Sequence, residues 1–224
     1  MGKGPTGGLG RRSFRVAAYG ILGLVAAQTI MDLAVTVAAG RHRGAFDLER
    51  SNSVPDLVSN LALAVAAAGA VAVTLREERG TRRALMGAVS VLLVLLTIAD
   101  FAHDGAHATS PGGLLVVGLA TATVLLLAVC TGSFAARPRT TFVVAACVLG
   151  ASLLSSGLRT MPAFDGRRSN PLKELRIVIK EGLELAGWSL VALALWDEAL
   201  ARRRDAAATA RASRAPAPPR RHAA

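Results

Sequence analysis

Six long apolar stretches constrain this chain more than any other feature of its sequence. They cover roughly residues 16–40, 57–75, 84–102, 113–135, 140–158 and 175–198. Each stretch is close to the ~20 residues that a helix needs to cross the hydrocarbon core of a bilayer. Residues 61–75 and 114–129 contain no charged side chain, which favours contact with lipid. The sequence therefore predicts an all-α fold, a polytopic membrane bundle of about six transmembrane helices.

The composition agrees with a lipid bilayer as the main partner. Hydrophobic residues make up 52% of the chain and charged residues 18%, whereas soluble domains carry about 25% charged residues. The net charge of +11 arises from arginines that cluster beside the apolar stretches. Because no aromatic side chains are interleaved with these arginines, we expect a membrane topology signal and no nucleic-acid partner.

The distribution of Lys and Arg predicts the orientation and three regions. With the N-terminus inside, seventeen Lys and Arg residues fall in cytoplasmic segments and seven on the opposite side. We therefore expect a plasma-membrane protein with both termini in the cytoplasm. Residues 1–15 form a basic N-terminus, residues 16–200 form the six-helix domain, and residues 201–224 form a disordered tail rich in Arg, Ala and Pro. The arginines of this tail are expected to contact anionic lipid.

Polar side chains lie inside the predicted spans, where they are costly and often mark a functional site. In the predicted topology, they all lie toward the extracytoplasmic side of the membrane. They belong to four of the predicted helices: Gln28, Asp32, Ser59, Asn60, Asp100, His103, His107, Glu181 and Glu184.

Three interpretations of these side chains remain open. Carboxylates and imidazoles are ligands for a divalent metal ion such as Zn, Mn or Fe, which would be held by Asp100, His103, His107, Glu181 and Glu184. The same groups can relay protons, because burial shifts the pKa of a carboxyl group toward neutrality. They can also be plain interfacial charges, with Glu181 and Glu184 paired to Lys180.

Three segments resemble the motifs of a bacterial multi-pass membrane protein family. The run Phe46–Arg50, followed by Val54-Pro55 and Ser59, is similar to its loop LDLDRE-x-x-IP-x-x-x-S. Asp100 with His103 or His107 is similar to its DE-x(4)-HE element, and residues 180–187 resemble its last-span motif EEGLExxG. Lys180 and Phe101 replace acidic residues of these motifs. The resemblance implies a shared extracytoplasmic site and implies no particular activity.

These observations lead to three hypotheses about function. The first is a metal-dependent membrane enzyme in which the bound ion activates water. The second is a proton-coupled small transporter or a subunit of one, and the third is a scaffold that binds a partner helix. The sequence contains no H-E-x-x-H, G-x-S-x-G or Gly-rich phosphate motif, so it leaves open whether the protein is an enzyme. It is also compatible with a homo-oligomer or another membrane partner.

Overall fold

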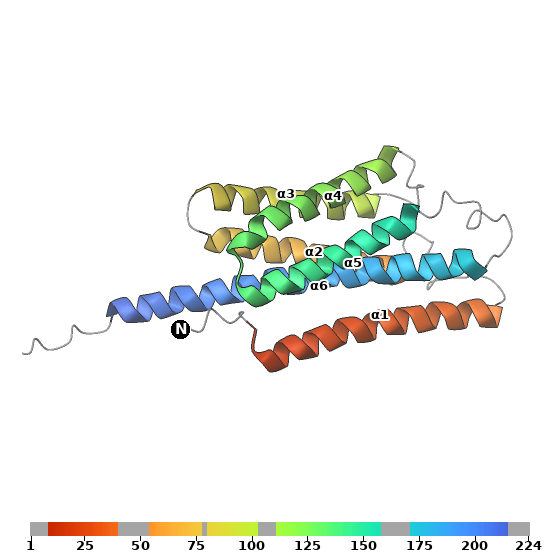
Figure 1. The fold of residues 1–224 in the computed structure, drawn as a ribbon, viewed down its shortest axis with the longest axis horizontal. Helices are drawn as coiled ribbons and strands as arrows, with labels where there is room; N and C mark the ends of the chain where they lie inside the picture. The colour runs from red at the N-terminus through yellow and green to blue at the C-terminus, as the bar shows by residue number, and fades with distance from the viewer. Residues whose placement is uncertain (1–8, 40–53, 78–79, 103–110, 158–170, 215–224) are drawn as a thin grey trace, which may run out of the picture.

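The computed structural model describes residues 9–39, 54–77, 80–102, 111–157 and 171–214 (Figure 1). These residues form helices and their connections, and they contain no β-strand. The elements in chain order are α1 (Arg11–Ala39), α2 (Val54–Arg76), α3 (Thr81–Ala102), α4 (Pro111–Cys130), the 3₁₀ helix η2 (Thr131–Ser133), α5 (Ala136–Gly157) and α6 (Pro171–Arg214). The predicted fold class, an all-α helical bundle, is confirmed.

Helix α6 is the centre of the bundle. It packs against α1, α2 and α5, whereas α3 packs between α2 and α4. Figure 1 shows α3 and α4 at one edge of the molecule and α1 at the other, with α6 between them. The most polar helix of the domain therefore touches more helices than any other.

Among the described residues, five helices are long and apolar enough to cross a membrane. The candidate spans are Arg11–Met31, Leu57–Arg76, Thr81–Phe101, Gly113–Ser133 and Ala136–Ser155. The sixth predicted span, 175–198, lies within α6, which carries more charge than the other five helices. Its burial among α1, α2 and α5 explains how a helix with this charge fits in the bundle.

Helix α6 is also longer than the apolar pattern indicates. The sequence predicts disorder from residue 201 onward, whereas α6 remains helical as far as Arg214 (Figure 1). Ala and Arg are among the strongest helix formers, and the first proline after the span is Pro216. An apolar pattern cannot indicate this part of the helix, because residues 203–211 are all exposed.

Small residues bring two helices close to α6. A Cβ atom at Gly69 of α2 would lie 3.0 Å from Cβ of Leu195, and a Cβ at Gly187 would lie only 2.5 Å from the side chain of Leu149 on α5. Ala66 and Ala70 next to Gly69 are completely buried. These close approaches fix the spacing of α2, α5 and α6.

Candidate functional site

The charged stretch of α6 is organised around a lysine. Nζ of Lys180 lies 2.5 Å from Oε1 of Glu181 and 3.4 Å from Oε2 of Glu184. The three side chains are each about one-third exposed, at 30%, 27% and 33%. One cation therefore bridges two carboxylates that the sequence predicts as metal ligands.

Helix α5 supports this stretch through the backbone. The Ser152 hydroxyl donates to the carbonyl of Lys180 over 3.2 Å, and the Ser155 hydroxyl donates to the carbonyl of Arg176 over 3.5 Å. Both serines are buried, as is Arg176, whose Nε atom has no hydrogen-bond partner among the described residues. We refer to Arg176, Lys180, Glu181 and Glu184 as the α6 charge cluster.

Helix α1 covers the same part of α6. A Cβ atom at Gly182 would lie 3.6 Å from the Val25 side chain and 4.0 Å from the Thr29 hydroxyl. Gln28, on the same part of α1, has a buried Nε2 atom without a hydrogen-bond partner among the described residues. The side chain of Asp32, a predicted member of the polar site, lies outside the described part of the chain.

The two predicted polar residues of α2 point in different directions. Thr74 of α2 contacts Ser90 of α3 through hydroxyl groups 3.1 Å apart. Asn60 precedes Thr74 by about four helical turns and lies about two and a half turns from Gly69, so it faces α3 and not α6. Ser59, half-buried, precedes the fully buried Ala66 by about two turns and lies on the same face of α2. Asn60 is only 1% exposed, and its Oδ1 atom has no partner among the described residues.

Asp100 lies on the buried face of α3. It follows the fully buried Leu93 by about two turns and is itself half-buried on that face of α3. Counted along the helices from the Thr74–Ser90 contact, Asp100 and Asn60 lie within about 6 Å of the same level. Because α2 lies between α3 and α6, Asp100 and the α6 charge cluster lie on helices on opposite sides of α2.

The predicted metal site stays a prediction. Within the described ranges, no group of three His, Cys, Asp or Glu side chains is placed to hold a metal ion. His103 and His107 lie outside those ranges, and Glu181 and Glu184 are engaged by Lys180. Asp100 and the two glutamates do not share one helix–helix interface in this part of the structure.

A second polar cluster, which the sequence did not predict, lies at the other end of α6. Asp197 is completely buried and forms a two-bond ion pair with Arg137 of α5, with distances of 2.8 Å from Nε to Oδ2 and 2.7 Å from Nη2 to Oδ1. The same pair binds the backbone of Leu9, because its N–H donates to Asp197 and its carbonyl accepts from Arg137, both over 2.5 Å. The Arg137 guanidinium also lies 4.6 Å from the ring centre of Phe14.

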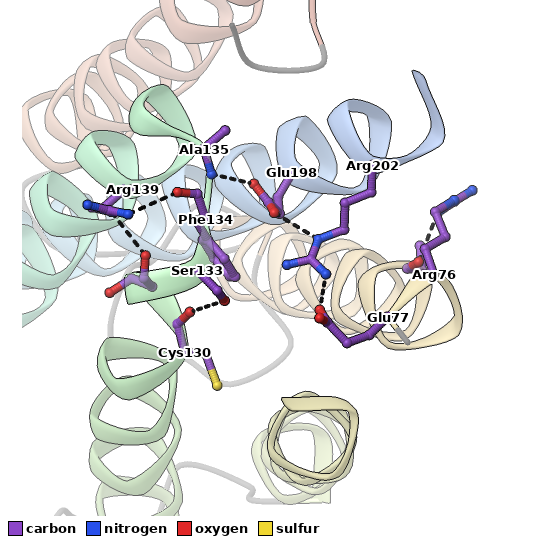
Figure 2. Close-up of polar contacts among 11 residues, drawn as sticks. Arg76, Glu77, Cys130, Ser133, Phe134, Ala135, Arg139, Glu198 and Arg202 are labelled. Atoms are coloured by element: carbon purple, nitrogen blue, oxygen red, sulfur yellow. Dashed lines mark hydrogen bonds and ion pairs between the residues drawn. The ribbon is translucent and has the colours of Figure 1, made fainter. Parts of the chain in front are cut away.

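Glu198 and Arg202 of α6 bind two more parts of the chain (Figure 2). Glu198 accepts a hydrogen bond of 3.0 Å from the Ala135 N–H, in the connection before α5, and one of 2.8 Å from Nε of Arg202. Arg202 in turn pairs with Glu77 at the end of α2. Burial lowers the pKa of the Arg202 guanidinium, which remains charged at neutral pH because an arginine does not deprotonate in proteins.

Arg139 completes this end of the bundle. Its guanidinium donates to the carbonyls of Thr131, Gly132 and Phe134 over 3.0, 2.8 and 3.1 Å, so it satisfies the carbonyls of η2 and the following residue (Figure 2). We call Leu9, Glu77, Ala135, Arg137, Arg139, Asp197, Glu198 and Arg202 the α6 latch. The acidic pair Asp197-Glu198, next to the apolar part of α6, is the sequence feature that could have indicated the latch. The sequence does not indicate which residues pair with these two carboxylates.

No protein-family model matches the chain, and neither the curated proteins nor the solved structures contain a significant match. The fold and the two polar clusters define a helical bundle with membrane-compatible helices and a charged central helix. The resemblance to the family with the EEGLExxG motif stays a prediction. The structure nevertheless gives the two glycines of that stretch a physical role, because Gly182 faces α1 and Gly187 faces α5.

Proposed function

We propose that the protein is a proton-translocating membrane protein, either a small transporter or a subunit of one, and that Lys180, Glu181 and Glu184 hold the proton in transit. The observation that carries this proposal is the lysine placed between two carboxylates in the membrane part of α6. Carboxylates at membrane depth are costly and usually mark a functional pathway, and either of the two that share Lys180 can accept a proton.

The surroundings of the cluster support a role in binding rather than in packing. Two buried donors, Nε2 of Gln28 beside the cluster and Nε of Arg176 within it, have no acceptor among the described residues. Water molecules or a polar solute would satisfy them, because buried polar atoms in proteins are almost always hydrogen-bonded. A polar path along α6 would also give a proton access to Glu181 and Glu184.

The division of the predicted metal ligands by α2 favours this proposal over the metal-dependent enzyme. A metal site needs at least three ligands that converge on one point, whereas proton transfer needs only one carboxyl group with access to water. Lys180 also competes directly with any cation for Glu181 and Glu184.

We further propose that the protein lies in the bacterial plasma membrane with the α6 latch on the cytoplasmic side. The support is the position of exposed arginines on the helix ends next to the latch, among them Arg11, Arg76, Arg83 and Arg203. Reporter fusions at Gly80 and after Ala224 should then report the cytoplasm, and a fusion at Ser110 should report the outside. A cytoplasmic signal at Ser110 would reverse this orientation.

Proteoliposomes that contain a pH-sensitive dye test the proposed function. With an imposed proton gradient, vesicles with the wild-type protein should acidify faster than protein-free vesicles. The Glu184→Gln and Glu181→Gln variants should fall to the protein-free rate, because each loses a carboxyl group that can bind the proton. Asp205→Asn, which changes an exposed carboxylate on the same helix, should keep the wild-type rate. Equal rates with wild-type protein and without protein would overturn the proposal.

A further inference from the structure

We infer that Arg76, Arg203 and Trp196 form a binding site for an anionic phospholipid, with the two arginines on the headgroup phosphate. The sequence predicts lipid contact for the arginines of the tail as a group. The structure places one of them, Arg203, beside a second helix and in line with an exposed indole. We call these three residues the lipid site. The inference goes beyond the proposed function, because it does not depend on proton translocation.

The packing of α2 on α6 sets the position of the two arginines. A Cβ atom at Gly69 of α2 would lie 3.2 Å from Cδ1 of Trp196, so these two positions face each other. Arg76 follows Gly69 by seven residues, and Arg203 follows Trp196 by seven residues. Because seven residues make about two turns of a helix, each arginine lies on the same face as the residue that precedes it. The two arginines therefore lie on the facing sides of α2 and α6.

An ion pair shows that the two helices still match in level at this point. Glu77 at the end of α2 pairs with Arg202 of α6 (Figure 2). Arg76 and Arg203 each adjoin one member of this pair, so they lie at nearly the same level on neighbouring helices. Both arginines are exposed. The end of α2 and the start of the exposed part of α6 thus present two guanidinium groups to one place.

Both guanidinium groups have hydrogen-bond donors to offer an anion. One donor of Arg76, on Nη1, bonds to the carbonyl of Ala72 over 2.9 Å, and a guanidinium carries five N–H groups in all. The planar arrangement of these groups matches two oxygens of a phosphate. A phosphate between Arg76 and Arg203 would also offset the repulsion between two cations that lie at one level.

The apolar part of the site favours a phospholipid over free phosphate. Trp196 is 36% exposed, although its indole N–H donates to the Val65 carbonyl over 3.0 Å, so the part of the ring that is exposed is apolar. Val65 and Leu75 of α2 are also exposed, at 40% and 69%. Trp196 lies about 10 Å along α6 from the level of the arginines, toward the predicted span. A phospholipid offers a phosphate to the arginines and acyl chains to this apolar surface.

Fluorescence quenching of Trp196 tests the site directly. The chain has two tryptophans, and Trp188 is only 3% exposed, so Trp188→Phe leaves the exposed indole as the single reporter. This variant is placed in phosphatidylcholine vesicles that contain a small fraction of phosphatidylglycerol with brominated acyl chains. Bromine quenches an indole that it contacts. We expect stronger quenching than with the same fraction of brominated phosphatidylcholine, and equal quenching by the two lipids would overturn the lipid site.

Two double variants with the same loss of charge separate this site from general attraction to a basic surface. Arg76→Gln/Arg203→Gln should reduce quenching by brominated phosphatidylglycerol to the level of brominated phosphatidylcholine, since each arginine at a membrane surface is worth on the order of fivefold in binding. Arg12→Gln/Arg82→Gln, at exposed positions on α1 and α3, should keep the original quenching. An equal loss in both double variants would overturn the site.

Two further measurements complete the test. Excess inorganic phosphate should leave the quenching by brominated phosphatidylglycerol unchanged, and a reversal would show a site for free phosphate and overturn the lipid. Native mass spectrometry counts the phosphatidylglycerol molecules that stay bound, with both tryptophans in place. Fewer should remain on Arg76→Gln/Arg203→Gln than on Arg12→Gln/Arg82→Gln, and equal numbers would contradict the inference. Neither measurement depends on proton entry, so the proposed function and the lipid site can fail separately.

Discussion

The two ends of α6 differ in how completely their polar groups are paired. At the latch, Asp197, Glu198 and Arg202 bind the chain before α1, the end of α2 and the connection before α5. At the charge cluster, one lysine is shared by two carboxylates, and donors on Arg176 and Gln28 have no acceptor among the described residues. Complete pairing stabilises one conformation, whereas incomplete pairing leaves polar atoms free for water, protons or a solute. This difference supports the proposal that the latch stabilises the bundle and that the charge cluster carries the function.

The largest loss of stability is expected from Asp197→Ala. This change leaves the Arg137 guanidinium without its buried partner and releases Leu9. Removing one member of a buried ion pair typically costs about 3–5 kcal/mol. Thermal unfolding of the purified protein in detergent measures this loss. The matched variant Asp205→Asn, at an exposed carboxylate, should stay within about 0.5 kcal/mol of the wild type, and an equal loss in both variants would contradict the proposed latch.

The next largest loss is expected from Gly187→Ala, which tests the close packing of α5 on α6 between the two clusters. The added methyl group would lie 2.5 Å from the Leu149 side chain, so one helix has to move. Overpacking of this kind costs about 1–3 kcal/mol. Gly118→Ala on α4 is the control, because a Cβ atom there has no neighbour within 4 Å. Gly118→Ala should be neutral or slightly stabilising; a similar loss at both glycines would show that the α5–α6 contact is not specific.

The sequence predicts the helices well and the polar contacts poorly. The apolar runs 57–75 and 84–102 differ from α2 and α3 by only a few residues at each end, because the length of a membrane span is fixed by the bilayer. The pairing of Arg137 with Asp197 joins residues 60 positions apart, and no local pattern encodes it. The direction of Asn60 depends on which neighbour faces each side of α2, which a single helix pattern does not determine. The predicted convergence of Asp100 with Glu181 and Glu184 depends on the neighbouring helices in the same way, and it stays a prediction.

A smaller loss is expected from Trp196→Phe, on the side of α6 that faces α2. The Trp196 indole donates a hydrogen bond of 3.0 Å to the Val65 carbonyl, and the phenyl ring keeps most of the apolar contact. Loss of one neutral hydrogen bond costs about 0.5–1.5 kcal/mol. Thermal unfolding of Trp196→Phe is compared with that of Trp188→Phe, which makes the same change at a buried indole. The comparison separates the loss of the hydrogen bond from the loss of packing. A larger loss of stability in Trp196→Phe than in Asp197→Ala would contradict the prediction that the latch contributes most to stability.

The smallest effect on stability is expected from Glu184→Gln at the charge cluster. Lys180 keeps Glu181 at 2.5 Å in this variant, so the cation retains a partner. A partly exposed ion pair of this kind contributes about 1 kcal/mol or less. The same variant should abolish proton entry into vesicles, which would separate function from stability. A loss of stability as large as that of Asp197→Ala would instead make the charge cluster a structural element.

Infrared difference spectra recorded between two pH values test the central claim most directly, because they detect the proton on the carboxyl group itself. On acidification, the wild-type protein should show the absorption of a protonated carboxyl group that is absent from the double variant Glu181→Gln/Glu184→Gln. Asp205→Asn should leave this absorption unchanged. Identical spectra for the wild type and the double variant would contradict the account, because Lys180, Glu181 and Glu184 would then bind no proton in the pH range of the measurement.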